Sequence, residues 1–85
     1  MVWICQFNLG AEDDLDKLSP DVRRQILKKV RFFVNSGNPL FFARRLTNNE
    51  LCMYRFRVGD YRVIFDVEGH KIMVVAVGHR REIYR

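Results

Sequence analysis

The alternation of apolar and polar residues is clearest in the C-terminal third of the chain, between Tyr54 and Asp66. Two alternating runs flank the pair Gly59-Asp60, which is typical of the two-residue turn of a β-hairpin. The predicted register pairs Val58 with Tyr61, Arg57 with Arg62, and Arg55 with Ile64. Like charges directly opposite each other destabilise a sheet, so neighbouring arginines favour a polyanion that lies across them.

Helical spacing takes over in the N-terminal half, after a short β-rich run from Val2 to Phe7. Asn8-Leu9-Gly10 ends that run, and the next apolar residues predict a short helix by their spacing: Ala11, Leu15 and Leu18. Ser19 and Pro20 are typical of the N-cap and first position of a second helix. Its apolar stripe ends near Asn35-Ser36-Gly37: Val22, Ile26, Leu27, Val30, Phe33 and Val34. The basic residues of its other face are expected in solvent: Arg23, Arg24, Lys28, Lys29 and Arg31.

Residues 38–50 read as a connection whose aromatic residues, Phe41 and Phe42, are expected to pack the second helix against the sheet, with a binding surface as the alternative. Three strand-like runs follow: Leu51 to Val58, Tyr61 to Val67, and Lys71 to Val77. The short links between them predict antiparallel neighbours.

The order β-α-α-β-β-β predicts a single α+β domain over residues 1–85, an antiparallel sheet with a helical hairpin packed on one face. The opposite face is free for function. By the predicted pairing it carries Arg55, Arg57, Arg62, Ile64 and Asp66. If Glu68-Gly69 forms the last turn, this face also carries Met73, Val75, Val77 and His79.

Charge changes this picture, because the net charge of +5 is concentrated in the C-terminal half. Up to Phe42, six Lys/Arg oppose five Asp/Glu, whereas from Ala43 onward nine oppose five. This asymmetry points to a partner that carries phosphate. Cys5 and Cys52 are expected to be reduced core thiols, and the apolar start is too short for a signal peptide or a membrane span, so we expect a cytoplasmic protein that contacts no membrane.

The candidate chemistry needs neither a metal nor a cofactor. His70 and His79 lie on different segments, and the glycines form no phosphate-binding loop or dinucleotide fingerprint. What remains near the end of the sheet is a group of arginines, His79 and Tyr84. Arginines bind phosphate and stabilise its developing charge, while histidine moves protons near neutral pH. These residues suit a metal-independent ribonuclease, although a passive nucleic-acid platform explains a basic face equally well.

Two motifs resemble the RelE/ParE toxin superfamily, and specifically its RelE-like branch. The first runs from Tyr54 to Phe65 and the second from Val77 to Arg85. The resemblance extends back through Leu15 to Val22, which is similar to the family's helical hairpin. It implies a RelE-like fold and a toxin of a type II toxin–antitoxin pair that cleaves messenger RNA in the ribosomal A site, inhibits translation, and is held inactive by a cognate antitoxin.

The resemblance also implies roles for individual residues. The family's basic strand residues fall on Arg55 and Arg57, its hairpin arginine on Arg62, its C-terminal arginine on Arg80 and its late tyrosine on Tyr84. We expect Arg62 and Arg80 to project from the sheet and to act in catalysis, with Arg55, Arg57 and Arg81 binding phosphate. Some members have lysines where Arg55 and Arg57 stand, and arginine gives up a proton far less readily.

The residue that moves the proton is therefore open. His79 is the first candidate, and Tyr84 and Glu82 are the others. The expected partners are the antitoxin, the ribosome and its messenger, and operator DNA bound through the antitoxin. ParE-like members with the same fold poison DNA gyrase, so gyrase inhibition without nuclease activity is the main alternative.

Overall fold

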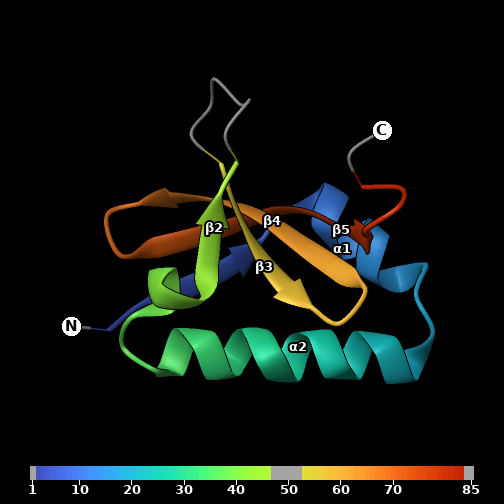
Figure 1. The fold of residues 1–85 in the computed structure, drawn as a ribbon, viewed down its shortest axis with the longest axis horizontal. Coiled ribbons are helices and arrows are strands. Elements are labelled where there is room, and N and C mark those ends of the chain that lie inside the picture. The colour runs from blue at the N-terminus through green and yellow to red at the C-terminus, as the bar shows by residue number, and fades with distance from the viewer. Residues whose placement is uncertain (1, 47–52, 84–85) are drawn as a thin grey trace.

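The computed structural model describes residues 2–46 and 53–83. Strand β1 (Ile4–Phe7) leads into helices α1 (Leu9–Asp16) and α2 (Pro20–Asn35). A 3-10 turn, η1 (Pro39–Phe42), and strand β2 (Ala43–Arg45) follow. The chain then forms β3 (Tyr54–Val58), β4 (Tyr61–Glu68) and β5 (Lys71–His79), and the helices lie beside one five-stranded sheet (Figure 1).

Both helices begin at residues that satisfy free backbone N–H groups. The side chain of Asn8 accepts a 2.8 Å hydrogen bond from the Ala11 N–H, so α1 starts at Leu9, within the segment expected to end the first strand. Ser19 caps α2 through the N–H of Val22 at 3.4 Å, and Pro20 occupies the first turn, as predicted. The second helix ends at Asn35, also as predicted.

The strand order is β1-β5-β4-β3-β2. The α+β class is confirmed, and the strands from β2 to β5 pair antiparallel. Strand β1 lies parallel to β5, so the sheet is mixed rather than wholly antiparallel. A parallel pair needs a long crossover, and here that crossover contains both helices and three strands.

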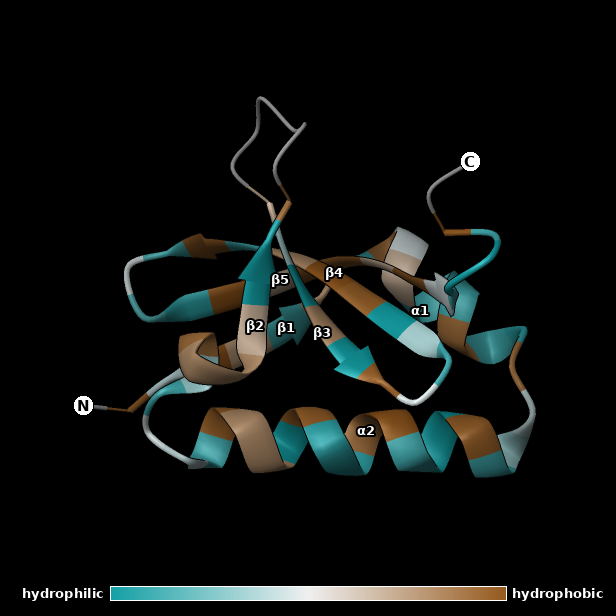
Figure 2. Cartoon of the chain, viewed as in Figure 1, coloured by the Kyte–Doolittle hydropathy of each residue, from teal (hydrophilic) through white to brown (hydrophobic). Residues whose placement is uncertain are grey.

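One face of the sheet and the apolar sides of the helices form the core. Ala11 and Leu15 of α1 and Ile26, Val30 and Phe33 of α2 pack with alternate residues of β3, β4 and β5. Figure 2 shows apolar and polar residues alternating along α2. The predicted apolar stripe of this helix faces the sheet, and of the basic residues expected in solvent Arg24, Lys28, Lys29 and Arg31 are exposed whereas Arg23 is half-buried.

Strand β2 lies in the segment that was expected to be a connection. Its three residues pair with β3, and their short, arginine-rich run carries almost no strand signal. The predicted packing role of the aromatic segment before it is confirmed for Phe42, whose ring stacks on Phe33 at 4.7 Å between centroids. Phe41 is 76% exposed.

The β3–β4 hairpin has the predicted register, with Arg57 opposite Arg62 and Gly59 in the turn at φ +58°. The next hairpin differs. Glu68 pairs with Lys71, so Gly69 and His70 form its turn, one residue later than expected. A register shift beside Ile64 and Phe65 leaves Val75 as an extra residue in β5. Such a bulge inverts the faces of all residues beyond it.

Within the described residues, no helix is long and apolar enough to cross a membrane.

Candidate functional site

Arginines from three adjacent strands share the sheet face opposite the helices. Arg44 of β2 pairs with Arg55 of β3, and Arg57 of β3 pairs with Arg62 of β4. Arg44 and Arg57 are exposed and Arg55 is half-buried. Two shallow hollows between these side chains share Arg44 and Arg55 in their lining. We call Arg44, Arg55, Arg57 and Arg62 the arginine face.

Arg44 is a member of this face that sequence reasoning missed. The pair Arg44-Arg45 was visible, but it lay in a segment without strand periodicity. Only the pairing of β2 with β3 places Arg44 opposite Arg55. Its side chain extends the basic surface one strand further than the predicted hairpin.

Arg62 lies on the predicted face, but it does not project from the sheet. The residue is 7% exposed, and its Nη1 donates to the backbone carbonyls of Gly59 and Tyr61, both at 2.9 Å. Its Nε is buried and has no hydrogen-bond partner among the described residues. A buried, incompletely paired guanidinium is costly in isolation, so a nearby anion would be strongly favoured.

Arg80 follows β5 and lies beside the tip of the β3–β4 hairpin. Its backbone N–H donates to the carbonyl of Asp60 at 2.8 Å, and its Nε lies 3.5 Å from Asp60 Oδ1. The Arg80 side chain is half exposed, as expected for a residue that projects. Arg80 and Arg62 therefore contact the same turn, one through Asp60 and the other through Gly59 and Tyr61.

The expectation that His79 and Val77 lie on the arginine face is wrong. Val77 is opposite Val63 and is part of the core, and His79 is opposite Tyr61, with 5.4 Å between their ring centroids. The extra residue Val75 is the physical reason, because it inverts the strand before both positions. Met73, which precedes the bulge, pairs with Asp66 on the predicted face.

The surroundings of His79 differ from the arginine face. A hollow at the end of β5 is lined by His79 and Tyr61 together with Asp14, Lys17 and Glu82. The Nδ1 of His79 accepts a 3.1 Å hydrogen bond from the backbone N–H of Arg81. The proton of the neutral ring is therefore placed on Nε2. Arg81 and Glu82 are exposed in the turn that follows, and Tyr84 lies outside the described residues.

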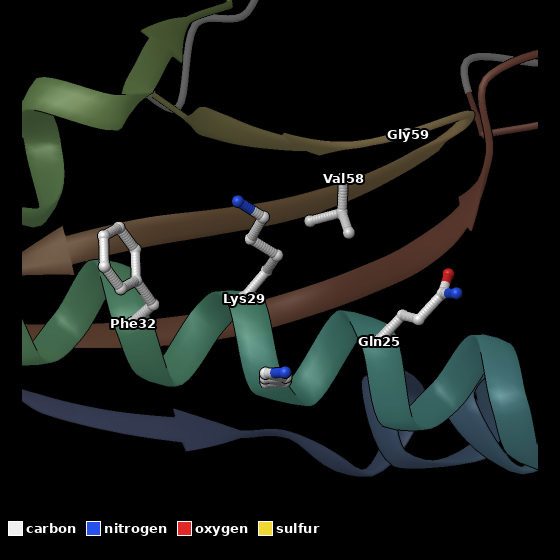
Figure 3. A pocket seen from close by; sticks show the side chains of 6 residues that line it. Gln25, Lys29, Phe32, Val58 and Gly59 are labelled. Carbon is white, nitrogen blue, oxygen red and sulfur yellow. The ribbon is translucent and has the colours of Figure 1, made fainter.

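An apolar pocket lies on the other side of the hairpin tip. Val58 and Gly59 line it from the hairpin, and α2 contributes Gln25, Lys28, Lys29 and Phe32 (Figure 3). Phe32 is 57% exposed, and the Nζ of Lys29 lies 5.6 Å from the centre of its ring. The pocket thus combines an apolar floor with a basic rim. In the described parts of the chain, no group of three or more His, Cys, Asp or Glu residues could hold a metal ion.

Comparison with solved structures identifies the same fold in toxins. A chain of the toxin–antitoxin complex RelBE2 from Mycobacterium tuberculosis has a TM-score of 0.81 at 23% identity, covering 94% of this chain and 100% of that one. For the RelB-RelE complex from Methanococcus jannaschii the TM-score is 0.73 at 26% identity, with 93% and 94% covered. A chromosomal ParDE system from P. aeruginosa gives 0.68 at 14% identity, with 92% and 96% covered.

None of the curated proteins compared with the chain matches it. A family model described as the ParE toxin of the type II toxin–antitoxin system parDE matches residues 6–84. The match includes both helices, all strands from β2 to β5 and the turn after β5. This chain therefore belongs to the ParE toxin family of type II toxin–antitoxin systems, within the RelE/ParE superfamily.

Proposed function

We propose that this toxin is a ribosome-dependent endoribonuclease that cleaves messenger RNA in the A site and so inhibits translation. In this reaction the RNA 2′-oxygen attacks the adjacent phosphorus, and the bond from phosphorus to the 5′-oxygen breaks. The 2′-hydroxyl loses a proton and the 5′-oxygen gains one. The products are a 2′,3′-cyclic phosphate and a 5′-hydroxyl, and no metal or cofactor takes part.

The arginine face is the observation that carries this proposal. The Arg57–Arg62 pair places two like charges opposite each other, and a phosphate backbone lying along β2, β3 and β4 would neutralise this basic surface. Exposed Arg57 and half-buried Arg55 bind the phosphates directly. Buried Arg62 supplies a fixed positive charge from beneath, and Arg80 and Arg81 contact the scissile phosphate and its neighbour from the hairpin tip.

Proton transfer falls to groups at the end of β5. His79 is the first candidate, and Tyr84 and Glu82 are the alternatives. His79 lies at the sheet end rather than on the arginine face, so the messenger would have to bend around that end. The ribosome holds the messenger in its A site and supplies that bend.

The partner that silences the toxin is a cognate antitoxin, and the toxin acts in the cytoplasm, where ribosomes are found. The apolar pocket between α2 and Val58 suits an acidic amphipathic segment, because Lys28 and Lys29 surround an apolar floor. A segment seated there lies beside the hairpin tip and can extend over the arginine face. The complex binds operator DNA through the antitoxin.

Inhibition of DNA gyrase is the second candidate function. The family model and the similarity to a ParDE system favour it. The two functions differ in their first effect on a cell, since gyrase poisoning breaks DNA and messenger cleavage arrests translation.

The test is induced expression without an antitoxin, followed by mapping of messenger 5′ ends and an assay for DNA breaks. We expect new 5′-hydroxyl ends within translated frames and intact DNA. Arg57→Ala should remove the ends, whereas Arg24→Ala, an equal loss of charge on the outer face of α2, should not. Intact messenger RNA together with broken DNA would contradict the ribonuclease proposal and support inhibition of gyrase.

A further inference from the structure

The tip of the β3–β4 hairpin is held in place from two sides. From the sheet, Arg62 Nη1 binds the carbonyls of Gly59 and Tyr61, which flank Asp60. From the C-terminal segment, the Arg80 N–H binds the carbonyl of Asp60 itself. The backbone of Asp60 is therefore held by the fold, and the backbone of Arg80 is hydrogen-bonded to the same residue.

The ion pair between Asp60 and Arg80 contributes little to stability. Both side chains are at least half exposed, at 68% and 50%, and pairs of this kind are screened by water and salt. Its geometry is more informative. Oδ1 of Asp60 lies 3.5 Å from Nε of Arg80, so the carboxylate is placed on the Nε side of the guanidinium. A guanidinium binds phosphate with two parallel hydrogen bonds from a pair of its nitrogens, and the pair formed by the two terminal nitrogens does not include Nε.

We infer that Asp60 is a positioning residue, which orients Arg80 so that its terminal nitrogens face the phosphate of a bound RNA. The effect on RNA cleavage rests on the proposed ribonuclease function, whereas the orientation of Arg80 by Asp60 does not depend on it. Nothing in the hairpin register requires an acid at this turn, since Gly-Gly and Gly-Asn turns serve as well. A residue that only orients Arg80 should act on the rate at saturation more than on RNA affinity.

Asp60→Asn removes only the charge, and Asp60→Gly removes the whole side chain. Both variants keep a favourable two-residue turn. Asp21→Asn is the matched control, because it makes the same charge change in an exposed ion pair with Arg24 at 3.2 Å on α2. In single-turnover cleavage on programmed ribosomes, Asp60→Gly should lower the saturated rate about tenfold. The concentration that gives half the maximal rate should stay the same or fall, because the variant loses a negative charge near the RNA.

The effect should disappear when Arg80 is absent. In an Arg80→Ala background, Asp60→Gly should change the rate by less than about twofold, because nothing is left to orient. An equal tenfold loss in that background would show a structural role and overturn the inference. A rate that rises in Asp60→Asn would also overturn it, because the carboxylate would then compete with phosphate for Arg80.

A second readout separates this inference from the proposed function. Heteronuclear relaxation of the Arg80 Nε–H in the free protein should show an ordered group in the parent and in Asp21→Asn, and a mobile one in Asp60→Gly. A parent that cleaves no messenger would remove the ribonuclease proposal and leave this result to decide the role of Asp60. An Arg80 Nε–H equally mobile in all three proteins would overturn the inference whatever the cleavage assay shows.

Discussion

The backbone N–H of Val77 donates a 2.9 Å hydrogen bond to Oδ2 of Asp14, across 63 positions of the chain. Strand β1 pairs with β5 only from Lys71 to Val74, so among the described residues no strand neighbours the later part of β5 on that side. Helix α1 lies there instead, and its half-buried carboxylate takes the place of a strand carbonyl. The strand that leads to His79 and Arg80 is therefore held by a side chain of α1.

We predict that Asp14→Ala lowers the free energy of unfolding by about 1 to 3 kcal/mol, because the partly buried N–H of Val77 loses its acceptor. Asp13→Ala, an exposed neighbour in the same helix, should change it by less than about 0.5 kcal/mol. Chemical denaturation of the two variants compares them directly. Equal stability of both would mean that water replaces the carboxylate without cost.

Much of the fold could be predicted from local pattern. The Ser19-Pro20 start of α2 and the Gly59-Asp60 turn are short-range signals, and the structure confirms both. The errors arise where one residue has a long-range effect. The sequence around Val75 gives no sign of a bulge, yet this extra residue places His79 on the helix side of the sheet. The position of a bulge depends on how the whole sheet packs, so the alternation of apolar and polar residues could not predict it.

In the candidate site, too, features set by local sequence could be predicted and features set by distant contacts could not. The pairing of Arg57 with Arg62 follows from the turn, and it was predicted correctly. Two features depend on contacts between distant segments and could not be predicted: the position of Arg44 opposite Arg55, and the contact of Asp60 with Arg80. The direction of a long side chain is equally invisible in a sequence, and Arg62 folds back onto its own turn.

Gly78 and Ile83 provide a test of how the C-terminal turn packs. A Cβ added at Gly78 would lie 3.1 Å from Ile83 Cδ1, so Gly78→Ala should displace the turn and cost about 1 kcal/mol of stability. Removing that methyl group with Ile83→Val should restore most of the loss. Gly10→Ala is the control, since its Cβ meets ordinary contacts and helix α1 favours alanine. Thermal denaturation of Gly78→Ala, of the double variant and of Gly10→Ala would refute this packing if Gly78→Ala were neutral.

The arginine face should determine the salt dependence of RNA binding. We predict that Arg57→Ala reduces the slope of log affinity against log salt concentration by about 0.7 on single-stranded RNA, the effect of one lost phosphate contact. Arg44→Ala should act similarly, because it is exposed opposite Arg55. Arg24→Ala on α2 should leave the slope unchanged. Filter binding at four salt concentrations measures this, and an equal loss in Arg24→Ala would indicate diffuse attraction instead of a site.

Cys5 should make stability depend on pH in the alkaline range. Burial raises the pKa of its thiol from 9.0 to about 11. The folded protein thus keeps a proton that the unfolded chain loses, so this contribution is complete below pH 9 and disappears as the pH rises through 11. In a Cys52→Ser background, the stability difference between Cys5 and Cys5→Ala should shrink from pH 7.5 to pH 10.5. If the stability difference between the two proteins did not change with pH, the Cys5 thiol would be exposed to water.

The last prediction separates two roles for His79, whose Nδ1 accepts a hydrogen bond from the Arg81 N–H. Asparagine places an acceptor near the position of Nδ1, whereas glutamine places its amide near Nε2. If His79 carries a proton, both His79→Asn and His79→Gln should slow single-turnover cleavage by about two to four orders of magnitude. Hydrogen exchange of the Arg81 amide should remain protected in His79→Asn and become fast in His79→Gln. Cleavage by His79→Asn within a few-fold of the parent would show that His79 only holds the turn, and the proton-transfer role would then pass to Tyr84 or Glu82.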